Sequence, residues 1–205
     1  MLWRDLLRAN AGAGLSIVSY STAANAGGTT LAFTTPSGAA DGDILLAWVV
    51  AQDSGSSWTP GSGFTEQYDG HPGVVSVELA SLELTAAPAG SYTFTCSTSQ
   101  KLSGIMVCIR AGTFGLIGSV DSKNPLSAPG ITMASGGLLF GFFAARSDSK
   151  TFSTPTGMTA VASDSDATAP SWALFSEEVP AGATGNRATS SSEGAWAALA
   201  GIYEA

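Results

Sequence analysis

The chain has 205 residues and a net charge of −8, because 16 acidic side chains outnumber 8 basic ones. Such an acidic chain is unsuited to binding the phosphate backbone of nucleic acids, and its many large apolar residues argue against intrinsic disorder. No apolar stretch reaches the roughly 18 residues that span a bilayer, so no membrane partner is expected. One domain of this length buries about 70% of its unfolded surface, so the core needs no disulfide or metal.

The first residues differ from the rest of the chain. Leu2 and Leu6, and likewise Trp3 and Leu7, lie four positions apart, so a helix would place all four side chains on one face. A glycine-rich stretch typical of a hinge follows. The sequence predicts an amphipathic helical arm with its hinge over residues 1–14. Because so short a helix is marginal alone, we expect these four side chains to dock on a partner.

From Leu15 onward the pattern is one of short strands and turns. Residues 92–97 alternate apolar and polar side chains, which is typical of a half-buried antiparallel strand. Turns rich in Pro and Gly recur about every ten to fifteen residues, which predicts an all-β fold, an antiparallel β-sandwich or jelly roll. Four runs are apolar on both faces and are expected to be the central strands: 44–51, 105–109, 138–145 and 196–203.

One predicted strand changes phase. Its apolar positions fall on odd numbers from Val75 to Leu79 and on even numbers from Leu82 to Leu84. A strand with one buried face needs an extra residue to restore that face. We therefore expect a β-bulge near residues 80–81.

The two halves of the chain resemble each other. Residues 43–51 align with residues 137–145, an offset of 94, and each half continues with a Thr-Pro loop, a strand, a Pro-Ala-Gly turn and a strand. About five strands are too few to bury a face alone. We expect the pseudo-repeats, about 15–110 and 111–205, to form a single sandwich over residues 15–205.

The sequence offers no catalytic set. His71, the only histidine, lies in a turn and is expected to be a plain loop residue. Asp164 and Asp166 alternate with Ser but lack the spacing of a calcium-binding loop. Nothing selects a glycosidase pair from the candidate carboxylates Glu66, Glu78, Glu83, Glu177 and Glu178. We therefore predict that the protein is not an enzyme and has no catalytic residue, cofactor or metal.

Two cysteines lie in the predicted strands. A hairpin centred near Leu102 would place Cys96 and Cys108 opposite each other on one face. With no secretion signal at the N-terminus, two buried free thiols are favoured over a disulfide.

The aromatic residues divide into two groups. Trp48, Trp172 and Trp196 lie in apolar strands and are expected in the core. Trp58 lies in a loop, and Phe152 occupies the corresponding region of the second half. A loop aromatic side chain can be a platform on which a sugar stacks, or a lid that closes one end of the sandwich. Its recurrence in both halves favours the lid.

Several turns and strands form a set that extends over nearly the whole chain after the first dozen residues. The set comprises Pro36-x-Gly with Asp41-Gly-Asp-Ile-Leu-Leu-Ala-Trp-Val-Val, Thr59-Pro-x-x-Gly-Phe-Thr, Ala89-Gly-Ser-Tyr-Thr-Phe, Ser103-Gly-Ile-Met-Val-Cys-Ile-Arg, Thr154-Pro-Thr-Gly-Met-Thr, Pro180-Ala-Gly and Trp196-Ala-Ala-Leu-Ala-Gly-Ile. It resembles the β-sandwich domains of bacteriophage virion proteins, which occur in minor tail, fibre and capsid-surface (decoration) proteins. The resemblance brings no catalytic residues with it.

The resemblance implies a non-enzymatic virion structural protein on the particle surface, anchored by its N-terminal arm. A capsid decoration or head-fibre subunit is favoured over a tail component, because the chain is small and lacks a shaft. The expected partners are other virion proteins and further copies of the chain, and the expected location is the virion, assembled in the host cytoplasm. The alternative is a carbohydrate-binding adhesion module that recognises host-surface glycans through Trp58 and Phe152. An exposed Trp58 would favour this alternative, whereas a buried one would disfavour it.

Overall fold

The structure is a computed structural model that describes residues 15–204, apart from residues 54, 72, 74, 121–125, 148, 166–168 and 191–194. Its regular elements are all β-strands, and no helix occurs within these described ranges. The all-β prediction is therefore confirmed. The helical arm predicted for residues 1–14 lies outside the described residues.

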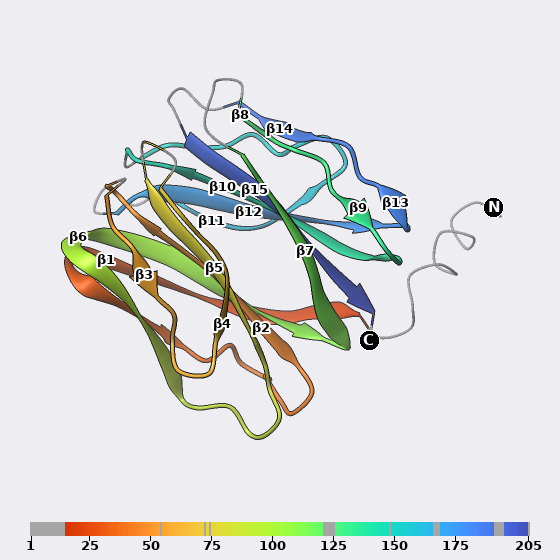
Figure 1. Cartoon of the computed structure of the whole chain (residues 1–205), viewed down its shortest axis with the longest axis horizontal. Coiled ribbons are helices and arrows are strands. Elements are labelled where there is room, and N and C mark those ends of the chain that lie inside the picture. The colour runs from red at the N-terminus through yellow and green to blue at the C-terminus, as the bar shows by residue number, and fades with distance from the viewer. Residues whose placement is uncertain are drawn as a thin grey trace.

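Two antiparallel sheets pack face to face as a sandwich (Figure 1). The first contains β1 (Ser16–Thr34), β2 (Ile44–Ala51), β3 (Trp58–Thr59), β4 (Thr65–Gly70), β5 (Ser76–Glu83) and β6 (Ser91–Arg110). The second contains β7 (Gly112–Val120), β10 (Gly137–Ala145), β11 (Thr159–Asp164), β12 (Ser171–Val179) and β15 (Ala195–Glu204). Of the two architectures expected from the turn spacing, the structure has the sandwich.

Each sheet is drawn from one half of the chain, and the two halves use the same strand order. The first sheet runs β1-β6-β2-β5-β4, with β3 paired to β6, and the second runs β7-β15-β10-β12-β11. The edge strands β4 and β11 each carry a register shift, between Glu66 and Tyr68 and between Ala160 and Ala162. The two shifts are 94 residues apart, the same offset as in the aligned sequences.

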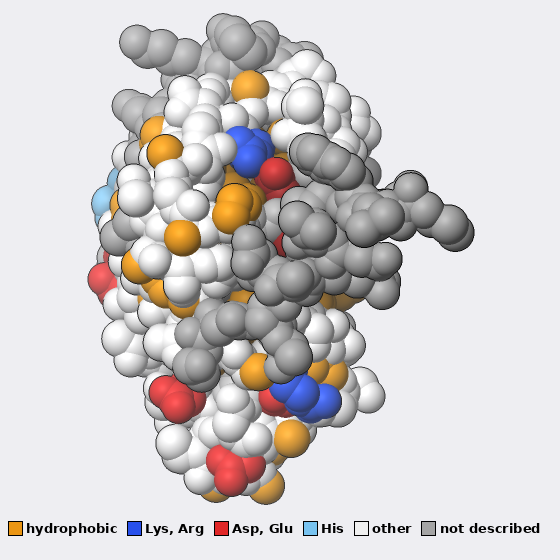
Figure 2. All heavy atoms as spheres, turned by 90° about the vertical axis from the view of Figure 1, so that its right-hand side faces the viewer, with side chains coloured by type: hydrophobic (Ala, Val, Ile, Leu, Met, Phe, Trp, Pro, Cys, Tyr) orange, Lys and Arg blue, Asp and Glu red, His pale blue; other side chains and the backbone are white. Residues whose placement is uncertain are grey.

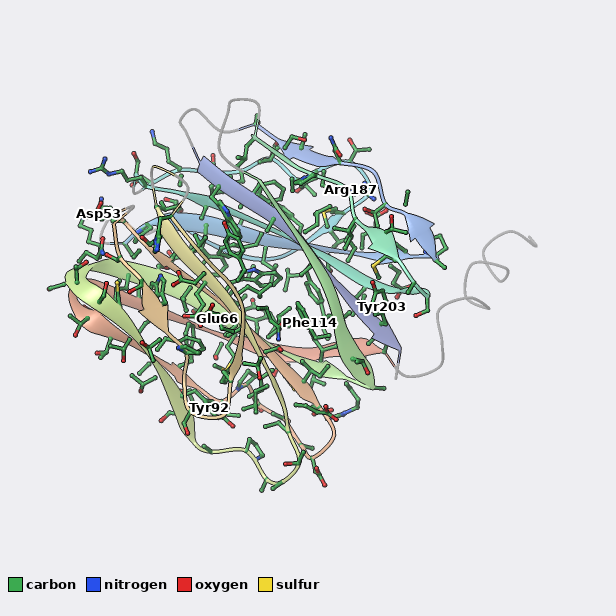
Figure 3. All side chains as sticks on the ribbon, in the orientation of Figure 1. Asp53, Glu66, Tyr92, Phe114, Arg187 and Tyr203 are labelled. Carbon is green, nitrogen blue, oxygen red and sulfur yellow. The ribbon has the colours of Figure 1, made fainter. Side chains whose placement is uncertain are left out.

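The central core lies between the sheets and is rich in aromatic side chains (Figure 3). Trp48, Trp172 and Trp196 are fully buried there, as predicted. Phe142 is the common neighbour of all three indoles, with ring centroids 5.3, 6.2 and 5.9 Å away respectively. Since these rings come from both sheets, they join the two halves.

The outer face of the first sheet is also buried. The register of β1 with β6 is irregular between Asn25 and Thr30, and beyond this point both strands continue as a ribbon over the sheet. Leu31, Phe33 and Phe94 on the ribbon pack in one cluster with Val49 and Met106 of the sheet, and we call this cluster the first outer core.

The second sheet is covered by shorter strands. Leu126 and Met133 from this covering layer pack on Leu139 and Phe143 of β10, and this cluster is the second outer core. The layer consists of two antiparallel pairs, β8 (Leu126–Ala128) with β14 (Arg187–Thr189), and β9 (Thr132–Met133) with β13 (Gly182–Ala183). These covers explain why β2, β6, β10 and β15 are apolar on both faces. All four were predicted to be central, and each has strand neighbours on both sides.

The β-bulge predicted near residues 80–81 is wrong. β5 pairs with β2 in unbroken register from Ser76 to Glu83. Leu79 faces the central core, whereas Ala80 and Leu82 face the first outer core. Because both faces of β5 are buried, the change of phase needs no extra residue to correct it.

The hairpin expected between the cysteines is also wrong, because β6 is one strand that passes Leu102 without reversing. Cys96 and Cys108 nevertheless both lie in the first outer core, as buried free thiols. Burial, with a smaller contribution from Asp43, raises the pKa of the Cys108 thiol to about 12. The thiolate that oxidation requires is therefore scarce at neutral pH.

We expect the purified protein, denatured without reductant under conditions that block thiol exchange, to have the intact mass of two thiols. The physical reason is that neither sulfur is exposed to an oxidant in the folded chain. A mass lower by two hydrogens would show that Cys96 and Cys108 are joined and would contradict this placement.

Candidate functional site

The predicted docking residues of the arm, Leu2, Trp3, Leu6 and Leu7, lie outside the described residues. The description begins at Leu15, which is partly buried against the central core and lines a groove beside β1.

Trp58 is not a surface platform, because only 4% of it is exposed. It packs in the first outer core. Its backbone N–H donates to Asp69 Oδ2 over 3.3 Å, and its indole Nε1 donates to the Ser76 carbonyl over 3.4 Å. A sugar cannot stack on a ring enclosed in this way, so the alternative of a glycan platform on Trp58 loses its support.

Phe152 has the corresponding role in the second half. It is partly buried against the second outer core, with its ring centroid 6.4 Å from that of Phe143. Trp58 and Phe152 thus cover opposite outer faces of the sandwich, and the structure does not bring them together. Both positions suit a covering role, although each side chain covers a sheet face and does not close an end of the sandwich.

Two grooves of similar size lie between the sheets. The β7 groove has a volume of about 540 Å³ and lies between the start of β7 and strands β4 and β5. The β1 groove has a volume of about 530 Å³ and lies between the start of β1 and strands β11 and β12. Four pairs of lining residues match between the halves: Ile44 and Leu138, Gly63 and Gly157, Thr65 and Thr159, and Ser81 and Ser176.

Each groove contains one polar contact that is already made. In the β7 groove, Gln67 Nε2 donates to Ser81 Oγ over 2.9 Å. In the β1 groove, Glu177 Oε2 accepts from Arg187 Nε over 2.8 Å and lies 2.7 Å from Arg187 Nη2. Phe114 adds apolar surface to the β7 groove. The described lining residues thus offer contact surface and no nucleophile paired with a base.

His71 is exposed and its Nδ1 lies 3.2 Å from Ser76 Oγ, a geometry that invites comparison with a catalytic Ser–His pair. Ser76 is fully buried, however, and its hydroxyl donates to the Asp53 carbonyl over 2.6 Å and accepts the Ser56 N–H over 3.1 Å. The equivalent Ser171 accepts an N–H in the same way from the loop after β10. The hydroxyl therefore holds a loop in place in each half.

The sequence places Asp43 in the acidic turn Asp41-Gly-Asp43, which is typical of a solvated loop, but the structure buries Asp43, leaving only 2% exposed. Its carboxylate accepts from Arg110 Nε and Nη2 over 3.0 and 2.9 Å, from the Ala40 N–H over 2.9 Å, and from Cys108 Sγ over 3.5 Å. The hydrogen bonds from Arg110 lower the pKa of this carboxyl below its usual range. Asp43 thereby fixes the turn before β2 to the end of β6.

Sequence reasoning considered Glu78 only as one of five carboxylates. The structure makes it the exception among them, because it is fully buried. The available signal was its place between Val77 and Leu79, in a strand whose residues before the terminal Glu83 are otherwise apolar or small.

Within the described ranges, no group of three or more His, Cys, Asp or Glu residues is placed to hold a metal ion. The same part of the chain has no helix long and apolar enough to cross a membrane. Figure 2 shows hydrophobic side chains scattered among polar atoms on the described part of one face, with few charged groups. Comparison with family models, with curated proteins and with solved structures finds no match to this chain.

Proposed function

We propose that the chain is a non-enzymatic structural protein of a bacteriophage virion. It is exposed on the particle surface as a capsid decoration or head-fibre subunit, or else as a tail component, and its N-terminal arm anchors it there. The observation that carries this proposal is the burial of both faces of both sheets, which gives a chain of 205 residues three packed cores. Such a domain is durable without disulfides or metal, which suits an exposed shell component.

The surface chemistry supports the same role. Charged residues make up 12% of the chain, about half the usual share, and few charged side chains appear on the described part of the face in Figure 2. The partners we propose are other virion proteins and further copies of the chain. The resemblance of the turn-and-strand motifs to virion domains is the reason for naming a virion.

The alternative of a glycan-binding adhesion module loses its main support in this structure. Its platform required the face of Trp58, which is enclosed between β4, β5 and the first outer core. Phe152, on the opposite side of the sandwich, is partly buried as well.

Deleting residues 1–12 is expected to leave a folded domain that no longer binds particles. The sandwich begins at β1, and the described members of the three cores run from Leu15 onward. Burying a large apolar side chain on a partner contributes about 1.5–3 kcal/mol, so losing the four predicted docking residues removes most of the affinity. The truncated protein should melt within a few degrees of the full chain, measured by circular dichroism, and should fail to co-sediment with particles.

A matched pair of variants separates the apolar face of the arm from its charge. Leu2→Ser with Leu6→Ser should abolish co-sedimentation, whereas Arg4→Gln with Arg8→Gln on the other face should retain it. If the truncated protein unfolds, or still binds particles as the full chain does, the anchoring role is wrong.

A further inference from the structure

Glu78 is a buried acid with no hydrogen-bond partner. Its neighbours Val77 and Leu79 face the central core, so its own side chain lies on the opposite face of β5, toward the first outer core. Its exposed fraction is 0%, and neither carboxylate oxygen has a partner among the described residues. A buried carboxylate in this state is strongly disfavoured unless it carries a proton or finds a donor.

Asp69 lies directly opposite Glu78 on the neighbouring strand β4. Directly opposed residues of an antiparallel pair have Cβ atoms about 4.5–5.5 Å apart on the same face. Asp69 Oδ2 accepts the backbone N–H of Trp58, whereas its buried Oδ1 has no partner in the part of the chain that is described. A proton on Glu78 would supply the donor that this Oδ1 lacks.

We propose that Glu78 and Asp69 form a carboxylic acid–carboxylate pair that shares one proton, and that this pair is a pH-sensitive latch on Trp58. The proton resides on Glu78, whose O–H donates to Asp69 Oδ1. Asp69 Oδ2 remains free to hold the Trp58 N–H. The inference stands independently of the proposed virion role.

The surrounding charges favour the protonated form. Asp69 and the exposed Glu66 are the ionisable groups that face Glu78 from β4, while β2 and β3 contain none. His71 lies near Ser76, the next residue on the same face of β5. Burial first, and then the negative charges of Asp69 and Glu66, raise the pKa of Glu78 from 4.5 to about 8.

The direction of the pH response follows from this raised pKa. In the closed state, Asp69 holds the Trp58 N–H and Glu78 is buried. Between about pH 4.5 and 8, Glu78 keeps its proton in this state and releases it when Trp58 detaches and water reaches the carboxyl. The opening equilibrium therefore rises by up to tenfold for each pH unit in this window and levels off above it. Opening is least favourable in acid and most favourable in mild alkali.

Hydrogen exchange of the Trp58 amide, followed by NMR and corrected for the intrinsic rate, measures this opening directly. In the wild-type protein we expect the opening constant at pH 7.5 to exceed that at pH 5.5 by up to about 100-fold. Glu78→Gln should abolish the dependence, because the glutamine amide can donate to Asp69 without ionising. Glu83→Gln, which changes an exposed glutamate of the same strand, should keep the wild-type profile.

Asp69→Asn provides a second variant that retains an acceptor for Trp58. The asparagine amide can donate to an ionised Glu78, so the opening constant should level off at a lower pH than in the wild-type protein. An opening constant that is flat in the wild-type protein from pH 5.5 to 9, or a pH dependence that persists in Glu78→Gln, overturns the latch. Added Ca²⁺ should not change the wild-type profile. Slower exchange in Ca²⁺ that is absent from Glu78→Gln would mean that a cation, and not a proton, joins the two acids.

Discussion

Replacing Phe142 with alanine is expected to lower the free energy of unfolding by about 3–5 kcal/mol, the range for a fully buried Phe. Phe142 is 0% exposed and its ring stacks on Trp48 at an interplanar angle of 7°. It also contacts Trp172 and Trp196, so its removal leaves a cavity that three indoles border and that a rigid core fills only partly. Chemical denaturation at pH 7 provides the measurement.

Phe152→Ala is the matched control for this prediction. This variant removes the same ring from a partly buried position on the second outer core, so the free energy of unfolding should fall by only about 1–2 kcal/mol. If Phe142→Ala and Phe152→Ala lower the free energy of unfolding equally, the aromatic cluster between the sheets is not the main contact that holds the two sheets together.

Asp43→Ala is expected to destabilise the protein by about 2–3 kcal/mol at pH 7. The variant removes the acceptor of both Arg110 bonds and leaves the Ala40 N–H without its partner. Because the Arg110 side chain is 49% exposed, it can turn to water, and the loss should stay below that of a fully buried ion pair. The loss reflects both the hydrogen bonds and the freed turn before β2.

The effect of Asp43 depends on pH in a defined direction. Its pKa is lowered below 3.8 in the folded chain, so its contribution is fully present above that value and is lost as the pH falls through the lowered pKa. Urea titrations should therefore show that the difference in free energy of unfolding between wild type and Asp43→Ala becomes smaller toward pH 2. Asp41→Ala, two residues away and exposed, should stay within about 0.5 kcal/mol of wild type. A gap that is constant from pH 7 to pH 2 would exclude an ionised Asp43 as its source.

The strand content and the central strands could be predicted from the sequence because they depend on local patterns. Runs apolar on both faces identified β2, β10, β15 and the second half of β6, and the spacing of turns predicted a sandwich or jelly roll, of which the structure has the sandwich. Gly63 and Gly157, which are 94 residues apart like the aligned segments, line equivalent positions in the two grooves, and both have positive φ, at 84° and 90°.

The outer layers could not be predicted, and this accounts for both errors in the fold. The bulge near residues 80–81 was inferred by assuming that β5 has one buried face, but a second face is covered by residues distant in sequence such as Leu31 and Phe94. The hairpin at Leu102 assumed strands of ordinary length, whereas β6 has 20 residues and serves both the sheet and its cover.

The candidate sites show the same limit. The pattern around Trp58 favours a cover but leaves a platform open, and the contacts of Trp58 with Asp69 and Ser76 decide for the cover. Glu78 looked like any other glutamate, because its burial depends on strands that pair with β5 and on the ribbon above them. The role of Asp43 could be recognised only once the fold places its distant partner Arg110 beside it.

The virion role is tested most directly by immunogold electron microscopy of gradient-purified phage particles from the host that expresses this chain, with antibody raised against residues 15–205. The proposal predicts regular labelling of the particle surface, on the head or else on the tail, and loss of the label from particles assembled with the chain lacking residues 1–12. Particles that carry no label, while the protein is found in the unassembled fraction, would contradict it.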